Sequence, residues 1–284
     1  MINDNVKKII QESLTEDIPT KDITTHYIDN NSTQQTAKII AKEPGIFCGE
    51  EIIQTLLNTI DENAKITLFN KDGDTIHPQD TVCEITAAAD TILKIERTLL
   101  NFLQHLCGIS TITHKFIKKL NNPNIKILDT RKTTPTLRYL EKHAVKTGGG
   151  HNHRANLSDA VLIKENHLTL FFKSHSIDQL PHLFKTYKSH HPSAFLEIEI
   201  ESIKQLETYD LSLVDFILLD NFKLELLNEA IIICRKRFPK TEIEISGNVS
   251  LETIQNYSKL DIDRISIGSL THSVKAFDLS LLIQ

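Results

Sequence analysis

Five cationic side chains gather around a glycine run in the middle of this sequence. They are Arg131, Lys132, Arg138, Arg154 and Lys164, and the glycine run is Gly148-Gly149-Gly150, followed by His151 and His153. The chain as a whole carries a formal net charge of −5. A protein that binds nucleic acid is normally basic overall or has a long basic stripe. The contrast predicts a local pocket for a small anionic molecule and argues against a nucleic-acid partner.

The types of these cations indicate which anion they suit. A planar ring with two carboxylates needs bidentate donors in its plane, which arginine supplies and lysine does not. Arg131 and Arg154 fit that role, with Lys164 as a point charge. The sequence leaves open that these residues are solvated surface cations or partners of nearby carboxylates.

Two carboxylates, Glu199 and Asp220, end consecutive predicted strands and are expected to lie side by side. Mg²⁺ binds to a few carboxylates when substrate phosphates and water complete its shell. The pair therefore predicts a magnesium site. An alternative is that both are structural carboxylates balanced by Lys164 and Lys132.

Two glycine turns follow the last two predicted strands. Ser246-Gly247-Asn248 and Gly268-Ser269 each come before a helical pattern, so their backbone N–H groups could bind a phosphate at a helix N-terminus. Ordinary turn chemistry explains either one alone. Their place on adjacent final strands matches the usual phosphate site of a barrel.

A zinc site is a weaker interpretation. His151 and His153 could join His143, but no cysteine lies nearby in the sequence and further ligands would be needed. The four cysteines are far apart and form no Cys-x-x-Cys pair. They are expected to be buried, reduced thiols. No Gly-x-Ser-x-Gly motif supports a serine hydrolase.

Short apolar strands alternate with helical runs in the second half of the chain. The predicted strands are 125–129, 160–164, 196–199, 215–220, 242–246 and 263–268. Such alternation predicts a parallel sheet, and repeated βα steps favour an open, incomplete α/β barrel over a doubly wound sheet. No Gly-x-Gly-x-x-Gly follows a strand. Because the carboxyl ends of barrel strands share one rim, the polar residues there should converge.

The first part of the chain predicts a smaller α/β unit. Its expected elements are a helix over 1–13, a strand that ends in a turn over 36–47, a helix over 50–60, strands over 64–69 and 81–86, and a long helix over 90–120 with a break at Gly108. With 284 residues, the chain is long enough to form either one large domain or one domain with a smaller second domain. No apolar run approaches the roughly 18 residues of a membrane span, so we expect a cytoplasmic protein without a membrane partner.

Long ordered motifs in this sequence resemble those of the quinolinate phosphoribosyltransferase family, also called nicotinate-nucleotide pyrophosphorylase (carboxylating), among the type II phosphoribosyltransferases. In the second half they are Asp129-Thr-Arg-Lys-Thr-x-Pro, Lys146-x-Gly-Gly-Gly-His-Asn-His-Arg154, Leu162-Ile-Lys-Glu-Asn-His167, Glu197-Ile-Glu199, Leu218-Leu-Asp-Asn-Phe222 and Gly268-x-Leu-Thr-His272. In the first half they are Leu14-x-Glu-Asp and Glu96-Arg-Thr-x-Leu-Asn-x-Leu-Gln104. The resemblance spans nearly the whole chain.

The resemblance implies a two-domain subunit and a homodimer. Residues 1–112 would form an α/β sandwich domain to which the tail, 274–284, returns, and residues 113–273 would form the barrel. One subunit's sandwich domain would cover the other's barrel mouth, so that the active site is shared. The implied reaction is a step of de novo NAD biosynthesis. In it, quinolinate and phosphoribosyl pyrophosphate give nicotinate mononucleotide, CO₂ and pyrophosphate, and Mg²⁺ is the cofactor.

The resemblance also assigns roles to residues. The residues implied to bind quinolinate are Arg97 of the other subunit, Thr130, Arg131, His153, Arg154 and Lys164. Those implied to bind phosphoribosyl pyrophosphate are Lys132, Glu199, Asp220, Ser246, Gly247, Asn248, Gly268 and His272. Lys132, Lys164, Glu199 and Asp220 would be catalytic, and Glu199 and Asp220 would hold the metal.

One residue departs from the family pattern. Where the family usually has Ser-Gly-Gly, this chain has Ser246-Gly247-Asn248. Asparagine can adopt a positive φ and keeps its own backbone N–H, so phosphate binding is expected to survive. Two other functions stay open: a related phosphoribosyltransferase that acts on another ring acid, and an anion-binding barrel without catalysis.

Overall fold

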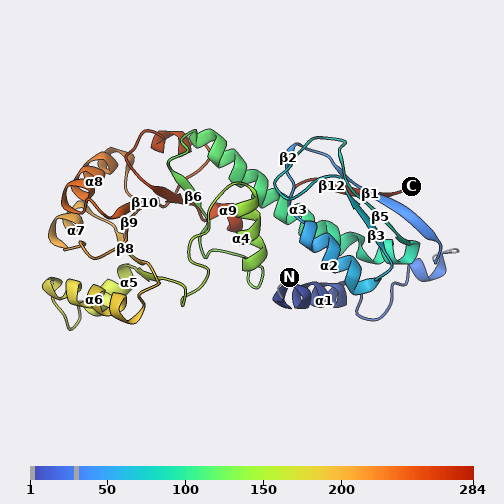
Figure 1. The fold of residues 1–284 in the computed structure, drawn as a ribbon, viewed down its shortest axis with the longest axis horizontal. Helices are drawn as coiled ribbons and strands as arrows, with labels where there is room; N and C mark the ends of the chain where they lie inside the picture. Colours follow the sequence, from blue (N-terminus) through green and yellow to red (C-terminus); the bar gives the residue numbers. More distant parts are fainter. Residues whose placement is uncertain (1–3, 29–31) are drawn as a thin grey trace. The chain divides into compact units, whose positions relative to one another are not determined.

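The computed structural model describes residues 4–28 and 32–284, and the chain divides into two compact units (Figure 1). Unit 1 consists of Met1–His114, Thr134–Gly149 and Leu270–Gln284, and unit 2 of Lys115–Thr133 and Gly150–Ser269. The range 113–273, expected as one barrel domain, includes residues 134–149, which lie in unit 1. Within the described residues, no helix combines the length and apolar composition needed to cross a membrane.

Unit 1 contains an antiparallel sheet with the strand order β12-β1-β5-β3. These strands are β1 (Gln34–Ala41), β3 (Lys65–Leu68), β5 (Thr81–Ala88) and β12 (Leu279–Ile283). The C-terminal strand β12 pairs with β1, where Ile39 lies opposite Leu281. Every second residue of β1 is buried from Ala37 onward, which gives the sheet one core-facing side.

The range 36–47, predicted as a strand that ends in a turn, contains most of β1 and a second short strand after the turn. After β1 ends, β2 (Gly45–Ile46) pairs with β4 (Thr75–Ile76) in a separate small sheet. Pro44 lies between β1 and β2 and has no N–H to donate to a ladder, which explains the interruption.

Unit 1 also contains several helices. They are α1 (Asp4–Asp17), α2 (Glu50–Ile60), the unit 1 part of α3 (Ala89–Leu120), α4 (Arg138–Thr147), the short 3₁₀ helix η1 (Thr25–Tyr27) and most of α9 (Ser269–His272). Helix α1 packs against α2 and buries Val6, Ile10 and Leu14. The predicted helix over 50–60 is confirmed as α2.

The break expected at Gly108 is absent, because α3 runs without interruption through this residue. A Cβ atom built on Gly108 would lie 2.5 Å from the Lys275 carbonyl oxygen and 2.8 Å from Val274 Cγ1. The glycine therefore lets the C-terminal segment pass close to the helix. In the sequence, this glycine therefore marks a close approach between two segments and not the end of a helix.

Unit 2 contains a parallel sheet with the strand order β6-β11-β10-β9-β8-β7. Its strands are β6 (Lys126–Leu128), β7 (Val161–Ile163), β8 (Leu196–Ile200), β9 (Phe216–Asp220), β10 (Glu242–Ser246) and β11 (Arg264–Ser266). The last strand pairs with the first, while β6 and β7 stand at the two ends of the order. This is an incomplete α/β barrel, as predicted. Strand β10 has its predicted bounds, and each end of the other strands lies within two residues of its predicted position.

Only some of the connections between the barrel strands contain the predicted crossover helices. Unit 2 contains α5 (Glu165–Phe171), η2 (Ile177–Gln179), α6 (Leu180–His190), α7 (Ile203–Thr208), α8 (Leu224–Arg237) and η3 (Ile254–Tyr257). Between β10 and β11 the described chain forms only the 3₁₀ helix η3, so the predicted α-helix there is wrong. A turn in which the Ser250 N–H donates to Thr253 Oγ1 at 3.0 Å occupies the start of this connection.

The strands of the barrel alternate apolar and polar residues although they are largely buried. Ile198, Ile200, Ile243 and Ile245 are all buried. The residues between them in sequence include carboxylates, as in Leu-Glu-Ile-Glu-Ile of β8. Because successive side chains of a strand point to opposite faces, one face of the sheet is apolar and the other carries charge. The charged face supplies the site described below.

Replacing Gly108 with alanine tests the close approach in α3. Alanine is favoured over glycine in a helix by about 1 kcal/mol, but its Cβ would overlap the Lys275 carbonyl, and such overpacking costs about 1–3 kcal/mol. We expect Gly108→Ala to lower the thermal midpoint of unfolding. The control Asn58→Ala, at an exposed position of α2, should leave the midpoint unchanged or raise it slightly. A midpoint raised by Gly108→Ala would contradict the assignment.

Candidate functional site

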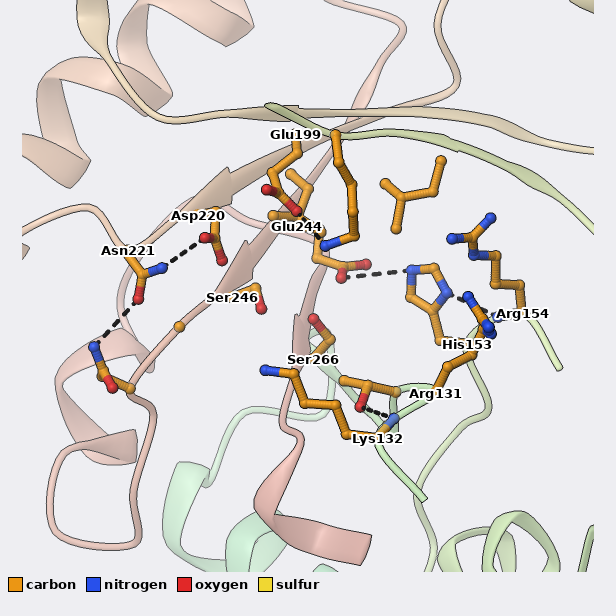
Figure 2. A pocket seen from close by; sticks show the side chains of 16 residues that line it. Arg131, Lys132, His153, Arg154, Glu199, Asp220, Asn221, Glu244, Ser246 and Ser266 are labelled. Carbon is orange, nitrogen blue, oxygen red and sulfur yellow. Dashed lines mark hydrogen bonds and ion pairs between the residues drawn. The ribbon is translucent and has the colours of Figure 1, made fainter. Parts of the chain in front are cut away.

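A pocket of about 610 Å³ lies in unit 2 and brings together most of the residues predicted for the site (Figure 2). The predicted residues that line it are Thr130, Arg131, Lys132, His153, Arg154, Lys164, Glu199, Asp220, Ser246, Gly247 and Asn248. They come from the carboxyl ends of the strands and from the loops that follow, where the sites of α/β barrels are built.

The two arginines form the cationic side of the pocket. Arg154 is 7% exposed, and its Nη1 donates to the Ala160 carbonyl oxygen at 3.1 Å. Burial lowers the pKa of Arg154, and the positive charge of Arg131 lowers it further. Two guanidinium groups close enough to disfavour each other's charge would be stabilised by an anion bound between them.

His153 has both ring nitrogens engaged by the protein. Its Nδ1 accepts from the Arg154 backbone N–H at 2.8 Å, and its Nε2 lies 2.8 Å from Glu197 Oε2. These partners place the ring proton on Nε2. The backbone N–H of His153 also donates to Asp129 Oδ1 at 2.9 Å. His153 is therefore fixed by three contacts and in turn fixes the backbone of Arg154.

Beneath the pocket, His153 joins a buried cluster of charged residues. Glu197 Oε1 lies 2.8 Å from Arg264 Nη2, and Glu244 Oε2 lies 2.5 Å from Arg264 Nε. The Arg264 guanidinium lies over the Phe216 ring, 3.3 Å from its centroid, in a cation–π contact. The two carboxylates thus share one guanidinium.

The pKa values of the two glutamates in this cluster shift in opposite directions. Burial raises the pKa of Glu244 to about 7, and the charge of Glu197 adds to this effect. Burial also opposes ionisation of Glu197, but the hydrogen bond from His153 and the charge of Arg264 outweigh it, so the pKa of Glu197 is lowered. Glu197 is thus the ionised partner of Arg264, and Glu244 holds a proton more readily.

Carboxylates also crowd the opposite side of the pocket. Glu199 Oε2 accepts from Lys164 Nζ at 2.8 Å, and Asp220 Oδ2 accepts from Asn221 Nδ2 at 2.6 Å. Burial raises the pKa of Glu199 to about 7, and the neighbouring Glu165 and Asp220 contribute to the increase against the effect of Lys164. This concentration of oxygen ligands and negative charge fits a hard divalent cation.

The turn after β10 has the backbone geometry that its glycine allows. Gly247 has φ 94° and Asn248 has φ 52°, so Asn248 does adopt the positive φ expected of it. A Cβ on Gly247 would overlap the side chain of Asn221, which donates its backbone N–H to the Ser246 carbonyl oxygen at 3.0 Å. No α-helix lies between this turn and β11 in the described chain, so the helix N-terminus expected after Asn248 is absent.

Three predicted site residues do not line the pocket. Gly268 lies in unit 2 outside its lining, and Arg97 and His272 belong to unit 1. Arg97 lines a separate pocket of about 530 Å³ in unit 1, together with Glu16, Asp17 and His105. His272 lies in the four-residue helix α9, and its Nδ1 is 2.7 Å from Ser273 Oγ.

The histidines proposed as zinc ligands have different surroundings. His143 lies in unit 1, where its Nε2 is 2.8 Å from Asp72 Oδ2. His153 lies in the Glu197–Glu244 cluster of unit 2. The backbone N–H of His151 donates to the Ile127 carbonyl oxygen, which extends the edge of β6. The grouping of these three residues is wrong.

Several residues of the pocket were not predicted from the sequence. They are Leu162, Leu218, Asn221, Glu244 and Ser266. Glu197 and Arg264, which lie below them, were also missed as supporting residues. The sequence did contain a signal for four of these residues, because side chains two positions apart in a strand lie on the same face. Each of the four comes two positions before a residue near the carboxyl end of its strand. The pairs are Leu162 and Lys164, Leu218 and Asp220, Glu244 and Ser246, and Arg264 and Ser266.

Glu244 gives the folded chain a specific pH dependence. Its pKa is about 7 in the folded protein against an ordinary value of 4.5, so the folded chain keeps a proton that the unfolded chain loses. The stability from this neutral carboxyl is full below about pH 4.5 and is lost as pH rises through about 7. Glu244→Gln cannot lose that proton, so the wild type should lose stability relative to this variant between about pH 5 and pH 7.5.

The measurement is thermal unfolding of both proteins at the two pH values. The expected relative loss is on the order of 1–3 kcal/mol. Glu229→Gln, at an exposed position of α8 outside the cluster, is the matched control and should follow the wild type. Equal pH dependence in wild type and Glu244→Gln would contradict the assignment.

Comparisons with known proteins agree with this geometry. Residues 22–107 match the family model "Quinolinate phosphoribosyl transferase, N-terminal domain", and residues 109–282 match "Quinolinate phosphoribosyl transferase, C-terminal domain". Together the two matches cover most of the chain.

Whole proteins align with this chain over nearly its full length. A probable nicotinate-nucleotide pyrophosphorylase (carboxylating) of Methanocaldococcus jannaschii is 38% identical over 99% of this chain and 98% of its own. One of Bacillus subtilis is 36% identical over 97% of this chain and 92% of its own. The solved nicotinate-nucleotide pyrophosphorylase of Francisella tularensis aligns with a TM-score of 0.90 at 36% identity, covering 100% of this chain and 98% of that one. Both domain models and these full-length similarities show that the chain belongs to the quinolinate phosphoribosyl transferase family.

Proposed function

We propose that this chain is a quinolinate phosphoribosyltransferase, which forms nicotinate mononucleotide, CO₂ and pyrophosphate from quinolinate and phosphoribosyl pyrophosphate. One observation carries the proposal: a single pocket combines two arginines and two lysines with a pair of carboxylates and a glycine turn, and Lys164 is paired with Glu199. Such a pocket has separate places for a dicarboxylate and for a phosphorylated sugar with its metal. The family of the chain supports the same reaction.

The cationic side would bind quinolinate. Arg131 and Arg154 would each hold a carboxylate with paired donors, and their mutual repulsion would be relieved by the dianion. Thr130 and Lys164 would complete this half. His153, whose ring nitrogens already have protein partners, would act by positioning Arg154 and not by direct contact.

The opposite side would bind phosphoribosyl pyrophosphate. Lys132 and the turn of Ser246, Gly247 and Asn248 would contact phosphate oxygens through cationic and backbone N–H donors. Glu199 and Asp220 would hold Mg²⁺. Bound there, this ion would take up negative charge from the departing pyrophosphate. Gly268 and His272 stay predictions from the resemblance.

The residues suit a reaction that needs no general base. The pyridine nitrogen of quinolinate has a free lone pair, so it can attack ribose C1 as the bond to pyrophosphate breaks. The nitrogen then becomes cationic and the ring can accept the electrons of the 2-carboxylate bond as CO₂ leaves. A proton replaces CO₂ at that carbon. Fixed charges oriented toward the changing charges would provide most of the rate increase.

The assembly and location belong to the same proposal. We propose a cytoplasmic homodimer in which Arg97 of one subunit reaches quinolinate in the barrel of the other. In support of this arrangement, Arg97 lines a pocket of unit 1, together with polar residues such as Asn101, and is not part of the barrel pocket.

The direct test is an assay of purified protein with quinolinate, phosphoribosyl pyrophosphate and Mg²⁺. We expect nicotinate mononucleotide and CO₂ in equal amounts, and no product when Mg²⁺ is removed with a chelator. With nicotinate in place of quinolinate, kcat/KM should fall by roughly 100-fold or more, because one cationic group loses its carboxylate.

Two results would replace the proposal. Turnover of another ring acid in preference to quinolinate would indicate a related transferase. Mg²⁺-dependent binding without any product would indicate an anion-binding barrel.

The shared site is tested by mixing two inactive variants. Arg97→Ala and Arg131→Ala should each lower kcat/KM roughly 100-fold or more. In a mixed dimer, one of the two sites would have both arginines, so purified mixed dimers should have about half of wild-type activity and the unpurified random mixture about a quarter. The subunits carry different affinity tags, and purified mixed dimers are assayed. Mixed dimers as inactive as the parents would rule out sharing.

A further inference from the structure

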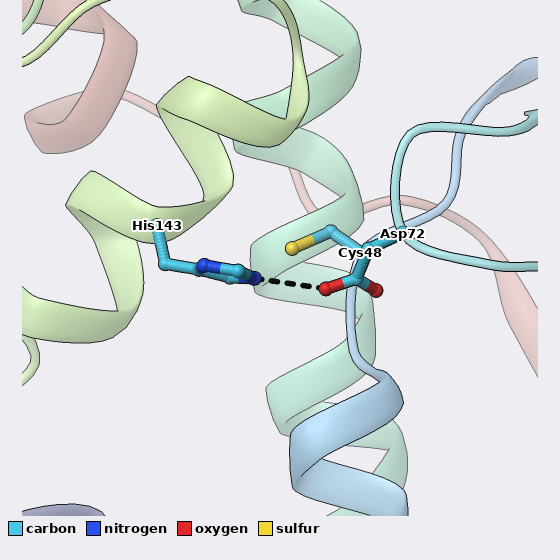
Figure 3. Close-up of side chains that lie close together, drawn as sticks. All are labelled: Cys48, Asp72 and His143. Carbon is cyan, nitrogen blue, oxygen red and sulfur yellow. Dashed lines mark hydrogen bonds and ion pairs between the residues drawn. The ribbon is translucent and has the colours of Figure 1, made fainter. Parts of the chain in front are cut away.

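A second cluster of chemically reactive side chains lies in unit 1. Cys48, Asp72 and His143 point toward one another (Figure 3), and one ligand atom of each lies within 4.8 Å of the other two. They come from three separate segments: the end of the β2 region, the turn between β3 and β4, and helix α4. None of the three lines the pocket of unit 2.

Asp72 is held so that one oxygen faces the cluster. Its Oδ1 accepts from the backbone N–H groups of Gly49 at 2.7 Å and Glu50 at 3.1 Å, at the start of α2. This leaves Oδ2, which lies 2.8 Å from His143 Nε2. The capping contacts therefore fix the carboxylate independently of the histidine.

Cys48 is fixed in a similar way. Its backbone N–H donates to Cys107 Sγ at 3.3 Å, and its side chain is fully buried. Burial raises the pKa of the Cys48 thiol well above its ordinary value, and the negative charge of Asp72 raises it further. The Cys48 thiol also has a hydrogen bond with the Thr147 side chain. Beside the ion pair of Asp72 with His143, it completes a group of sulfur, oxygen and nitrogen ligand atoms that lie within 4.8 Å of one another.

We propose that Cys48 Sγ, Asp72 Oδ2 and His143 Nε2 bind a divalent transition-metal ion, with zinc as the best match. Zinc takes thiolate sulfur, imidazole nitrogen and carboxylate oxygen in a four-coordinate site. The two anionic ligands would neutralise its charge. Mg²⁺ and Ca²⁺ are poor matches, because they prefer oxygen ligands.

The cluster has room for solvent on one side. The His143 side chain is 39% exposed, whereas Cys48 is fully buried. Water would enter from the histidine side as the fourth ligand. Binding would release the thiol proton as the sulfur–metal bond forms. The proton that His143 Nε2 donates to Asp72 would also leave this nitrogen, to Nδ1 in a neutral ring or to solvent from a protonated ring, and two bonds to the ion would replace the His143–Asp72 hydrogen bond. The ion would tie α4 to the turn and to the start of α2.

The test uses full-length, reduced, metal-free protein titrated with Co²⁺, a spectroscopic substitute for zinc. A thiolate ligand gives a sulfur-to-cobalt charge-transfer band in the near ultraviolet. We expect one Co²⁺ per chain to produce this band, and zinc to abolish it by displacement. Cys48→Ser should remove the band, and His143→Gln should weaken Co²⁺ binding by about 100-fold or more.

Matched variants separate this site from its neighbours. Cys83→Ser, at another buried cysteine of unit 1, and Cys107→Ser should both keep the band. Glu199→Gln should also keep it, which separates the cluster from the proposed magnesium site. Circular dichroism checks that each variant is folded, and His143→Gln serves if Cys48→Ser is not. Absence of the band in wild type, or a band that persists in folded Cys48→Ser, would overturn the proposal.

Discussion

Arg264 supplies the charge that lets the barrel interior carry two glutamates. It contacts Glu197 and Glu244 within 2.8 Å and lies over the Phe216 ring. A buried carboxylate without a partner is strongly destabilising, and removing one partner of a buried ion pair costs about 3–5 kcal/mol. The polar face of the sheet therefore depends on this guanidinium. Its role is to make the charged interior tolerable more than to add net stability.

The same cluster fixes the position of a pocket residue through contacts that begin in the barrel interior. Glu197 holds His153 Nε2, and His153 Nδ1 holds the backbone N–H of Arg154. Each step is a contact of 2.8 Å between buried groups, so the Arg154 backbone is held through His153 by Glu197, which does not line the pocket. Fixed charge of this kind acts at no reorganisation cost during a reaction. The backbone of Arg154, which lies in a loop, is therefore fixed as a strand residue would be.

The sequence predicted the pocket better than it predicted the surrounding chain. Strand ends are readable because apolar runs stop at a charged residue, as at Lys164 and Asp220, and parallel strands align these ends at one rim. Gly108 was misread because a close approach between segments distant in sequence leaves the same signature as a helix end. The connection after β10 was misread because local turn contacts replaced a helix whose pattern was weak.

The missed residues show a different limit of sequence reading. Glu244 lies in the middle of β10 and Arg264 at the amino end of β11, so neither is at the carboxyl end of its strand. Both are buried, and nothing in the neighbouring sequence accounts for a charged residue at either position. Only pairing across the sheet explains them, since Glu244 lies beside Arg264 in the register of β10 and β11. The alternation of Glu and Ile in β8 and β10 was nevertheless visible in the sequence. Read with period two, it places one row of carboxylates inside the barrel, and a row of buried carboxylates requires a buried cation.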